Sequence, residues 1–296
     1  MTNSYSRQWG GTHPGCLILL LDQSGSMADP FGQAQAGAGR KKSDMVATVL
    51  NGFLNELIVT NTIVQKDNTT EVRPRADIAV IGYEGHTVGS ALTGLLSSKD
   101  FVTLPELQMN PIDIEQRRRK EIDETGREFE IPISFPIWVK PMAGGGTPMC
   151  AALRQARDLA DRWADSHPSN YPPVIINVTD GMATDGDPAE VAREIYQIRT
   201  DDGHALLFNV HITDINSAPV MYPASERELP DDKYARSLFS ISSVIPETSR
   251  LLLQSLLGRP VEEGARGLIF NGDAASVRQM FVFASVPATQ VLDMNR

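Results

Sequence analysis

The stretch Cys16-Leu-Ile-Leu-Leu-Leu-Asp22-Gln-Ser24-Gly-Ser26 decides the fold of this chain. Its first six residues are apolar, which is the pattern of a strand buried on both faces of a parallel sheet. Oxygen-bearing side chains follow at once, and Gly25 allows a sharp turn between the two serines. The stretch therefore predicts a central strand whose carboxyl end carries Asp22, Ser24 and Ser26.

The rest of the chain alternates between strand and helix patterns. Buried strand patterns recur at Arg75–Tyr83, Pro173–Thr179 and Ala205–Thr213, and apolar helical stripes at 45–58, 148–163, 189–200 and 274–283. This alternation predicts an α/β fold, with a doubly wound, mostly parallel central sheet and helices on both faces. No linker is apparent, so we expect one domain over residues 1–296, with a core at about 14–286.

Three polar residues stand where predicted helices begin. Ser43, Thr147 and Asp187 are the expected N-caps, with Pro148 and Pro188 at the first helical positions after the last two. His211 alternates with polar residues along a predicted strand, and we interpret it as a structural histidine rather than a ligand.

Helical periodicity stops between residues 101 and 140. Polar and apolar residues alternate there on both sides of Glu124-Thr-Gly-Arg127, which predicts an inserted β-ribbon. The run Arg117-Arg-Arg-Lys120 could contact nucleic acid. Acidic residues follow closely, however, at Glu121, Asp123, Glu124 and Glu128, so a solvated ribbon edge is the favoured interpretation.

Composition narrows the possible partners. The 27 Lys and Arg against 37 Asp and Glu give a net charge of −10, which disfavours nucleic acid and anionic membranes. Apolar runs are far shorter than the roughly 20 residues that span a bilayer, and no signal-peptide pattern is present, so we expect a cytoplasmic protein. Cys16 and Cys150 form no CxxC pair and are expected to be free, buried thiols.

Oxygen donors gather at three predicted loops. They are Asp22, Ser24 and Ser26 after the first strand, Thr147 after Gly144-Gly-Gly, and Asp180 at the end of a later strand. The carboxyl ends of parallel strands share one edge of a sheet, so these side chains can converge on a hard cation such as Mg²⁺ or Mn²⁺. Each residue also has a purely structural explanation, as a turn or helix-cap residue.

The pattern Asp22-x-Ser24-x-Ser26, with the distant Thr147 and Asp180, resembles the metal-ion-dependent adhesion site of von Willebrand factor type A domains. The resemblance implies that Ser24 and Ser26 bind the metal directly. It also implies that Asp22 and Asp180 bind it directly or through water, and that Thr147 binds it in one state of the site. It covers about residues 14–215 most strongly.

Two other segments resemble cytoplasmic bacterial members of that family, including members linked to tellurite-resistance and stress operons. These segments are Gly144–Met149 and Leu238–Glu247. Such relatives often end in a cysteine-rich zinc ribbon, which this sequence lacks, so no role of that ribbon is carried over.

The resemblance implies a protein–protein interaction module and not an enzyme. The five residues supply only two carboxylates, which can bind through water, so a bound dication would keep much of its positive charge. In the family its sixth ligand is often an acidic side chain of a protein partner. By the same analogy, the partner could be a kinase, phosphatase or ATPase encoded nearby in a stress or signalling system.

Two other functions stay open from the residues. The first is a Mg²⁺-dependent hydrolase or phosphatase that uses Asp22 and the bound metal. Asp22-Gln23-Ser24 lacks the second acid of a DxD motif, and neither a GxSxG elbow nor a P-loop is present, which disfavours catalysis. The second is a scaffold that binds no metal.

Overall fold

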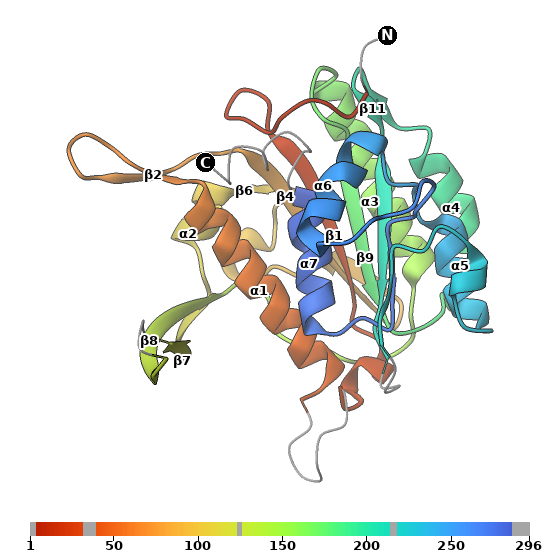
Figure 1. The fold of residues 1–296 in the computed structure, drawn as a ribbon, viewed down its shortest axis with the longest axis horizontal. Helices are drawn as coiled ribbons and strands as arrows, with labels where there is room; N and C mark the ends of the chain where they lie inside the picture. Colours follow the sequence, from red (N-terminus) through yellow and green to blue (C-terminus); the bar gives the residue numbers. More distant parts are fainter. Residues whose placement is uncertain (1–3, 32–39, 123–125, 214–217, 286–296) are drawn as a thin grey trace.

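The central sheet is the organising feature of the computed structural model, which describes residues 4–31, 40–122, 126–213 and 218–285 (Figure 1). Eight strands within these ranges pair in the order β13-β14-β12-β9-β1-β4-β5, and β6 also pairs with β4. The inner strands are β1 (Gly15–Asp22), β4 (Ala76–Glu84), β9 (Val174–Thr179), β12 (Leu206–His211) and β14 (Leu268–Phe270). They are all parallel to their neighbours in this group.

Antiparallel pairing is confined to the margins of the sheet. The strands concerned are β5 (Thr87–Ser90), β6 (Val102–Thr103) and β13 (Val220–Met221). The predicted α/β fold with a mostly parallel central sheet is therefore confirmed.

Strand β1 is buried on both faces, as its unbroken apolar run predicts. Leu17, Leu19 and Leu21 belong to one core cluster, and Cys16, Ile18 and Leu20 belong to the other. The first cluster packs under α1 (Lys42–Thr60), α6 (Glu247–Leu257) and α7 (Ala274–Ser285), and the second under α3 (Met149–Ser166), α4 (Pro188–Ile195) and α5 (Lys233–Ile241). Helices thus cover both faces of the sheet.

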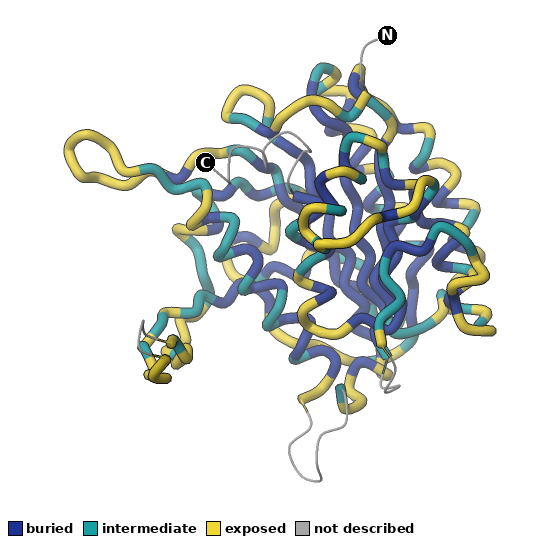
Figure 2. Tube along the Cα trace, viewed as in Figure 1, coloured by how far each residue is buried: buried dark blue, intermediate teal, exposed yellow. Residues whose placement is uncertain are grey.

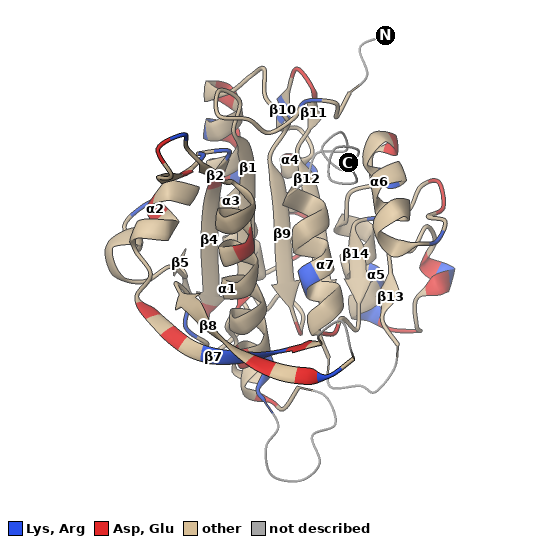
Figure 3. Ribbon diagram, turned by 60° about the vertical axis from the view of Figure 1, so that its left-hand side comes forward, with Lys and Arg blue, Asp and Glu red and all other residues tan. Residues whose placement is uncertain are grey.

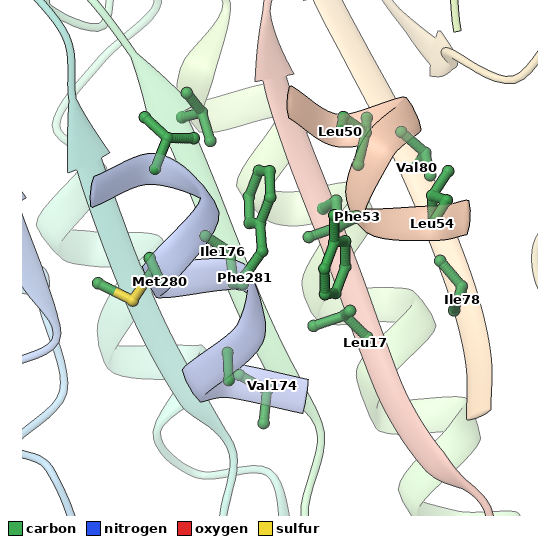
Figure 4. Packing of buried hydrophobic residues seen from close by; sticks show 14 of the residues in the cluster. Leu17, Leu50, Phe53, Leu54, Ile78, Val80, Val174, Ile176, Met280 and Phe281 are labelled. Carbon is green, nitrogen blue, oxygen red and sulfur yellow. The ribbon is translucent and has the colours of Figure 1, made fainter. Parts of the chain in front are cut away.

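Helices α1 and α7 meet over the first face. The rings of Phe53 and Phe281 lie 5.3 Å apart between them, above Leu17 and Ile176 of the sheet (Figure 4). Figure 2 shows burial concentrated in these strands and in the inner sides of the helices. The carboxyl ends of the parallel strands remain near the surface, where connecting loops can carry a site.

Two predicted helix caps are wrong. Helix α1 begins at Lys42, with Lys41 as its N-cap, because Asp44 accepts a bond from the Lys41 amide; Ser43 therefore lies inside the first turn. Helix α3 begins at Met149, because Pro148 has a non-helical ψ of 56°, and so Thr147 is not its N-cap. Asp187 does cap α4, since its Oδ1 accepts a bond of 2.9 Å from the amide of Ala189.

The helix predicted to reach residue 200 ends at Ile195. Residues after it form a small hairpin of β10 (Arg199–Thr200) and β11 (Gly203–His204). Thr200 pairs with Gly203, so Asp201 and Asp202 form the turn, and aspartate is a residue type that favours turns. A second small hairpin pairs β2 (Thr62–Val64) with β3 (Thr70–Val72).

The inserted ribbon is shorter than predicted. It consists of β7 (Asp113–Ile122) and β8 (Glu128–Ile137), paired antiparallel, whereas the segment before it forms β6 and the helix α2 (Leu104–Met109). The side chains of Thr103 and Glu106 form a capping box that starts α2, which is a signal that sequence analysis missed. Residues 123–125 of the expected turn lie outside the described ranges.

In the ribbon, Lys and Arg form one block in β7, and Asp and Glu lie on both sides of this block and in β8 (Figure 3). Its four consecutive cations each pair with a glutamate of the same ribbon: Arg117 with Glu115, Arg118 with Glu130, Arg119 with Glu121 and Lys120 with Glu128. This internal neutralisation agrees with the solvated interpretation of the basic run. No helix within the described residues is long and apolar enough to cross a membrane.

Candidate metal centre

The order of the strands brings two of the predicted loops together. From β1 the chain passes to β4 on one side and later returns to β9 on the other side, so the direction of winding reverses at β1. In such sheets ligands bind outside the carboxyl ends of the strands at this reversal. Leu21 of β1 lies opposite Val178 of β9, so Asp22 and Asp180 follow neighbouring strands at the same edge.

Asp22 is held at the end of β1 by hydrogen bonds to both carboxylate oxygens. The Ser24 amide donates to Oδ1 at 2.8 Å, and the Thr179 hydroxyl donates to Oδ2 at 2.7 Å. Burial raises the pKa of Asp22; the bonds from Ser24 and Thr179 counter this effect, and the charge of Asp180 adds to it. Hydrogen bonds thus fix the orientation of the Asp22 carboxylate, and burial makes its negative charge unfavourable. A nearby cation would stabilise that charge.

The two serines connect Asp22 to Asp180. The Oγ atoms of Ser24 and Ser26 lie 3.2 Å apart, and the Ser26 hydroxyl donates to Oδ1 of Asp180 at 2.7 Å. Adjacent oxygens around an octahedral Mg²⁺, at about 2.0–2.1 Å from the ion, are about 3 Å apart. The spacing of these oxygens therefore fits neighbouring positions of a magnesium shell.

The loop that carries Thr147 is joined to the loop after β1 by backbone hydrogen bonds. The Gly25 amide donates to the Gly145 carbonyl at 2.9 Å, and the Gly144 amide donates to the Gln23 carbonyl at 2.7 Å. Gly145 has φ of +64°, and a Cβ there would lie 2.5 Å from Cα of Gly85. A glycine is needed at position 145 because the loop packs backbone to backbone there. Thr147 itself is buried, and its carbonyl accepts a bond of 2.9 Å from the amide of Thr184 in the loop after Asp180.

Three residues that sequence analysis missed also shape the cluster. Thr179 orients Asp22, and Thr184 binds the Thr147 amide through its hydroxyl at 3.0 Å. Lys42 places its Nζ 2.9 Å from Oδ2 of Asp180. A lysine at the first position of a helix opposes the helix dipole, which was the only local signal that Lys42 has another role.

The donor set restricts the kind of metal. Within the described ranges, no three side chains of His, Cys, Asp or Glu are grouped to hold an ion. The cluster offers two carboxylates, and its remaining side-chain donors are hydroxyl oxygens. That chemistry is unlike the nitrogen and sulfur sites of zinc, and it fits a hard ion that keeps several waters, such as Mg²⁺.

His211 lies next to Thr179 across the β9–β12 pair but belongs to the core. Its ring stacks on Phe270 with centroids 4.4 Å apart. Burial lowers its pKa to about 4, so the imidazole is neutral at pH 7. The structure agrees with the interpretation of His211 as a structural residue.

A pocket of about 170 Å³ opens beside the cluster. Its lining includes Gly181 and Met182, which follow Asp180, together with Pro188, Tyr234 and Leu238. The lining combines apolar and polar side chains at the surface. It provides space for groups that flank a ligand of the cluster.

Comparisons with known proteins do not assign a family. No family model and no curated protein matches the sequence. The fold resembles proximal thread matrix protein 1 of the mussel byssus (TM-score 0.42, 12% identity, 92% of this chain and 48% of that chain). It also resembles the PilB minor pilin of Streptococcus sanguinis (TM-score 0.43, 9% identity, 94% and 61%). A membrane-spanning protein of Vibrio fischeri matches at TM-score 0.24 and 17% identity, over 66% of this chain and 69% of that chain.

This chain thus spans about half of the mussel protein and under two thirds of the pilin. Similarity at these levels gives no information about function.

Proposed function

We propose that this chain is a von Willebrand factor type A-like domain with a metal-ion-dependent adhesion site. Asp22, Ser24, Ser26, Thr147 and Asp180 would hold Mg²⁺ or Mn²⁺, and the ion would capture an acidic side chain of a protein partner. The observation that carries the proposal is the set of contacts at the reversal point of the sheet: the Ser24 amide donates to Asp22, the Ser24 and Ser26 hydroxyl oxygens lie 3.2 Å apart, and the Ser26 hydroxyl donates to Asp180.

The charges of the cluster support capture of an anion. Two carboxylates can at most neutralise a dication, and Asp22 already uses both oxygens to accept protein hydrogen bonds. Bound metal would supply positive charge and an exchangeable position, while the protein residues orient the site. The neighbouring pocket has room for residues beside the partner's acidic group.

The hydrolase alternative is less favoured than this binding function. Asp22 lacks the neighbouring second acid of a DxD motif, and the hydrogen bonds from Ser24 and Thr179 hold its carboxylate in one orientation while leaving each oxygen a lone pair for an ion. We therefore place the protein among binding modules. Its partner in this proposal is a protein of a cytoplasmic bacterial stress or signalling complex, such as a kinase, phosphatase or ATPase.

Isothermal titration of metal-stripped protein with Mg²⁺ and Mn²⁺ tests the proposal. We expect one saturable site, weakened by about tenfold or more in Ser26→Ala and in Asp180→Asn. Ser97→Ala is the matched control, because Ser97 is also exposed but bonds the Gly94 carbonyl in a distant turn. Millimolar acetate should tighten metal binding by the wild type.

Failure of the wild type to bind either ion would overturn the proposal. Binding that survives in both Ser26→Ala and Asp180→Asn would place the ion elsewhere. Circular dichroism of each variant confirms that a loss of binding is not a loss of fold.

A further inference from the structure

Lys42 is the one buried lysine that the described residues place against the candidate metal centre. Its side chain is 6% exposed, and the side chain of its partner Asp180 is 0% exposed. Lysine is almost never buried without a paired charge. The contact with Asp180 therefore explains why a long, strongly hydrated side chain lies here.

The position of Lys42 is fixed by the same segment that carries the serines. The Lys42 amide donates to the carbonyl of Asp29 at 3.0 Å, directly after the turn Gly25–Ala28. Pro30 and Lys41 form an isolated antiparallel bridge next to it. The start of α1 and the serine turn are thus one structural unit, and the ammonium is aimed at the site.

The two oxygens of Asp180 have different partners. Oδ1 accepts from Ser26, on the side of the proposed metal shell, and Oδ2 accepts from the ammonium of Lys42. An ion bound to Oδ1 would lie across the same carboxylate from a second positive charge. Like charges this close repel strongly where water is excluded.

We propose that Lys42 is an internal cation that neutralises the metal-free site and competes with Mg²⁺ for Asp180. The inference rests on the proposed function, because it concerns the same site. Without metal, Asp22 and Asp180 carry two negative charges, and Lys42 offsets one of them. Metal loading moves the ammonium away from Asp180 on its flexible four-carbon stem.

The competition sets the metal affinity of the site. A structure with Lys42 in place is stable without metal, because Asp180 is already paired. Binding of Mg²⁺ must break that pair, so the site fills only at a higher metal concentration than the same oxygens would otherwise need. Removal of the ammonium should make the metal-free protein less stable and should let the site fill at a lower metal concentration.

The test compares wild-type protein with Lys42→Met and Lys41→Met, in Mg²⁺ titrations by calorimetry and in thermal unfolding with and without millimolar Mg²⁺. Lys41 is the exposed neighbour, so its substitution removes the same charge outside the site. We expect Lys42→Met to lower the Kd for Mg²⁺ by about tenfold or more. Lys41→Met should leave the Kd within about twofold, because exposed charges are screened.

Lys42→Met can be unstable without metal, because a buried Asp180 charge is then unpaired. In that case Mg²⁺ should restore folding, with a far larger rise in Tm than in the wild type. Lys42→Arg retains the charge and should keep the wild-type Kd.

Equal Kd values for the wild type and Lys42→Met would overturn the inference and leave the metal site standing. A Lys42→Met protein that stays unfolded in Mg²⁺, or a Lys42→Arg protein that gains affinity equally, would show a packing role and also overturn it. If no variant binds metal, the proposed function itself is wrong.

Discussion

Asp180 shows how one residue can serve two purposes at this site. Its Oδ1 accepts a hydrogen bond from the Ser26 hydroxyl, and its Oδ2 pairs with Lys42, which lies 138 residues earlier in the chain. Removal of one member of a buried ion pair usually costs about 3–5 kcal/mol, because the other charge stays buried. Asp180→Asn, which keeps the shape and a hydrogen-bonding oxygen, is therefore a better probe of metal binding than Asp180→Ala.

The two cysteines give a prediction at the residue scale. Burial raises the pKa of Cys150 to about 12, with a further contribution from the charge of Asp185, and burial raises that of Cys16 well above its usual value. The thiolate is the reactive form. At pH 8 we expect neither thiol of the folded protein to react with an aromatic disulfide reagent, and both to react in guanidinium.

The raised pKa values of the two cysteines also determine how the stability of the folded protein changes with pH. The unfolded thiols lose protons near pH 9, before the folded ones, so stability from this source is present below that pH and is lost as the pH rises from about 9 towards 12. Rapid labelling of one thiol in native protein at pH 8 would show that Cys150 is accessible and contradict the prediction.

Most residues of the β7–β8 ribbon are exposed or half-buried. Its outer part is largely exposed, whereas Phe135 lies against Gly52 of α1 and Trp138 is buried beyond the end of β8 (Figure 2). A two-stranded ribbon contributes little stability unless a face of it is packed. The ribbon therefore divides into an anchored base and a solvated end.

Shortening the ribbon tests this division. Gln116 and Ser134 lie opposite each other, so Asn-Gly can replace residues 117–133 as a two-residue turn. We expect the free energy of unfolding in urea to change by less than about 1 kcal/mol, because surface ion pairs contribute little, with metal affinity unchanged.

Trp138→Ala is the contrasting variant at the ribbon base. Its ring is 1% exposed and donates to the Leu107 carbonyl at 2.8 Å, so its loss should cost about 3–5 kcal/mol. A shortened protein as unstable as Trp138→Ala would show that the outer ribbon belongs to the core.

On the scale of the whole molecule, a buried polar chain crosses the sheet beneath the site. Tyr83 donates to Asn177 at 2.8 Å, Asn177 to Asn209 at 3.1 Å, and Asn209 to Ser242 at 2.9 Å. The Ser242 hydroxyl then donates to the Leu238 carbonyl at 2.7 Å. This chain joins β4, β9, β12 and α5, so it fixes the relative positions of strands whose ends carry the site.

Asn177→Leu should break this chain at its centre. The substitution keeps a similar volume but leaves Tyr83 and Asn209 without their buried partner, and each unpaired group costs about 1–3 kcal/mol. We expect a loss of about 2–4 kcal/mol in urea unfolding. Ser240→Ala, on the exposed side of α5, should change stability by less than about 0.5 kcal/mol. A loss below 1 kcal/mol for Asn177→Leu would mean that water replaces the missing contacts.

The sequence by itself determined the elements that local patterns encode. The run 16–21 has the pattern of a strand buried on both faces, and this pattern predicts that the oxygen-bearing residues after it and at Asp180 share an edge of the sheet. The cap at Asp187 could also be predicted from the sequence, because an aspartate at the N-cap position and a proline directly after it are both local signals. By contrast, the errors at Ser43, Thr147 and α2 concern helix ends, where a single ψ angle or capping contact decides the boundary.

Only the tertiary structure decided what surrounds the site. Lys42 reaches Asp180, Thr179 holds Asp22 and Thr184 holds Thr147 because the sheet brings distant segments together, and no local period records such contacts. Apolar periodicity shows which face of each segment packs against the core. It does not show which buried charged side chains from different segments pair with each other. The oxygen donors were therefore visible in the sequence, whereas the cation already among them was visible only in the fold.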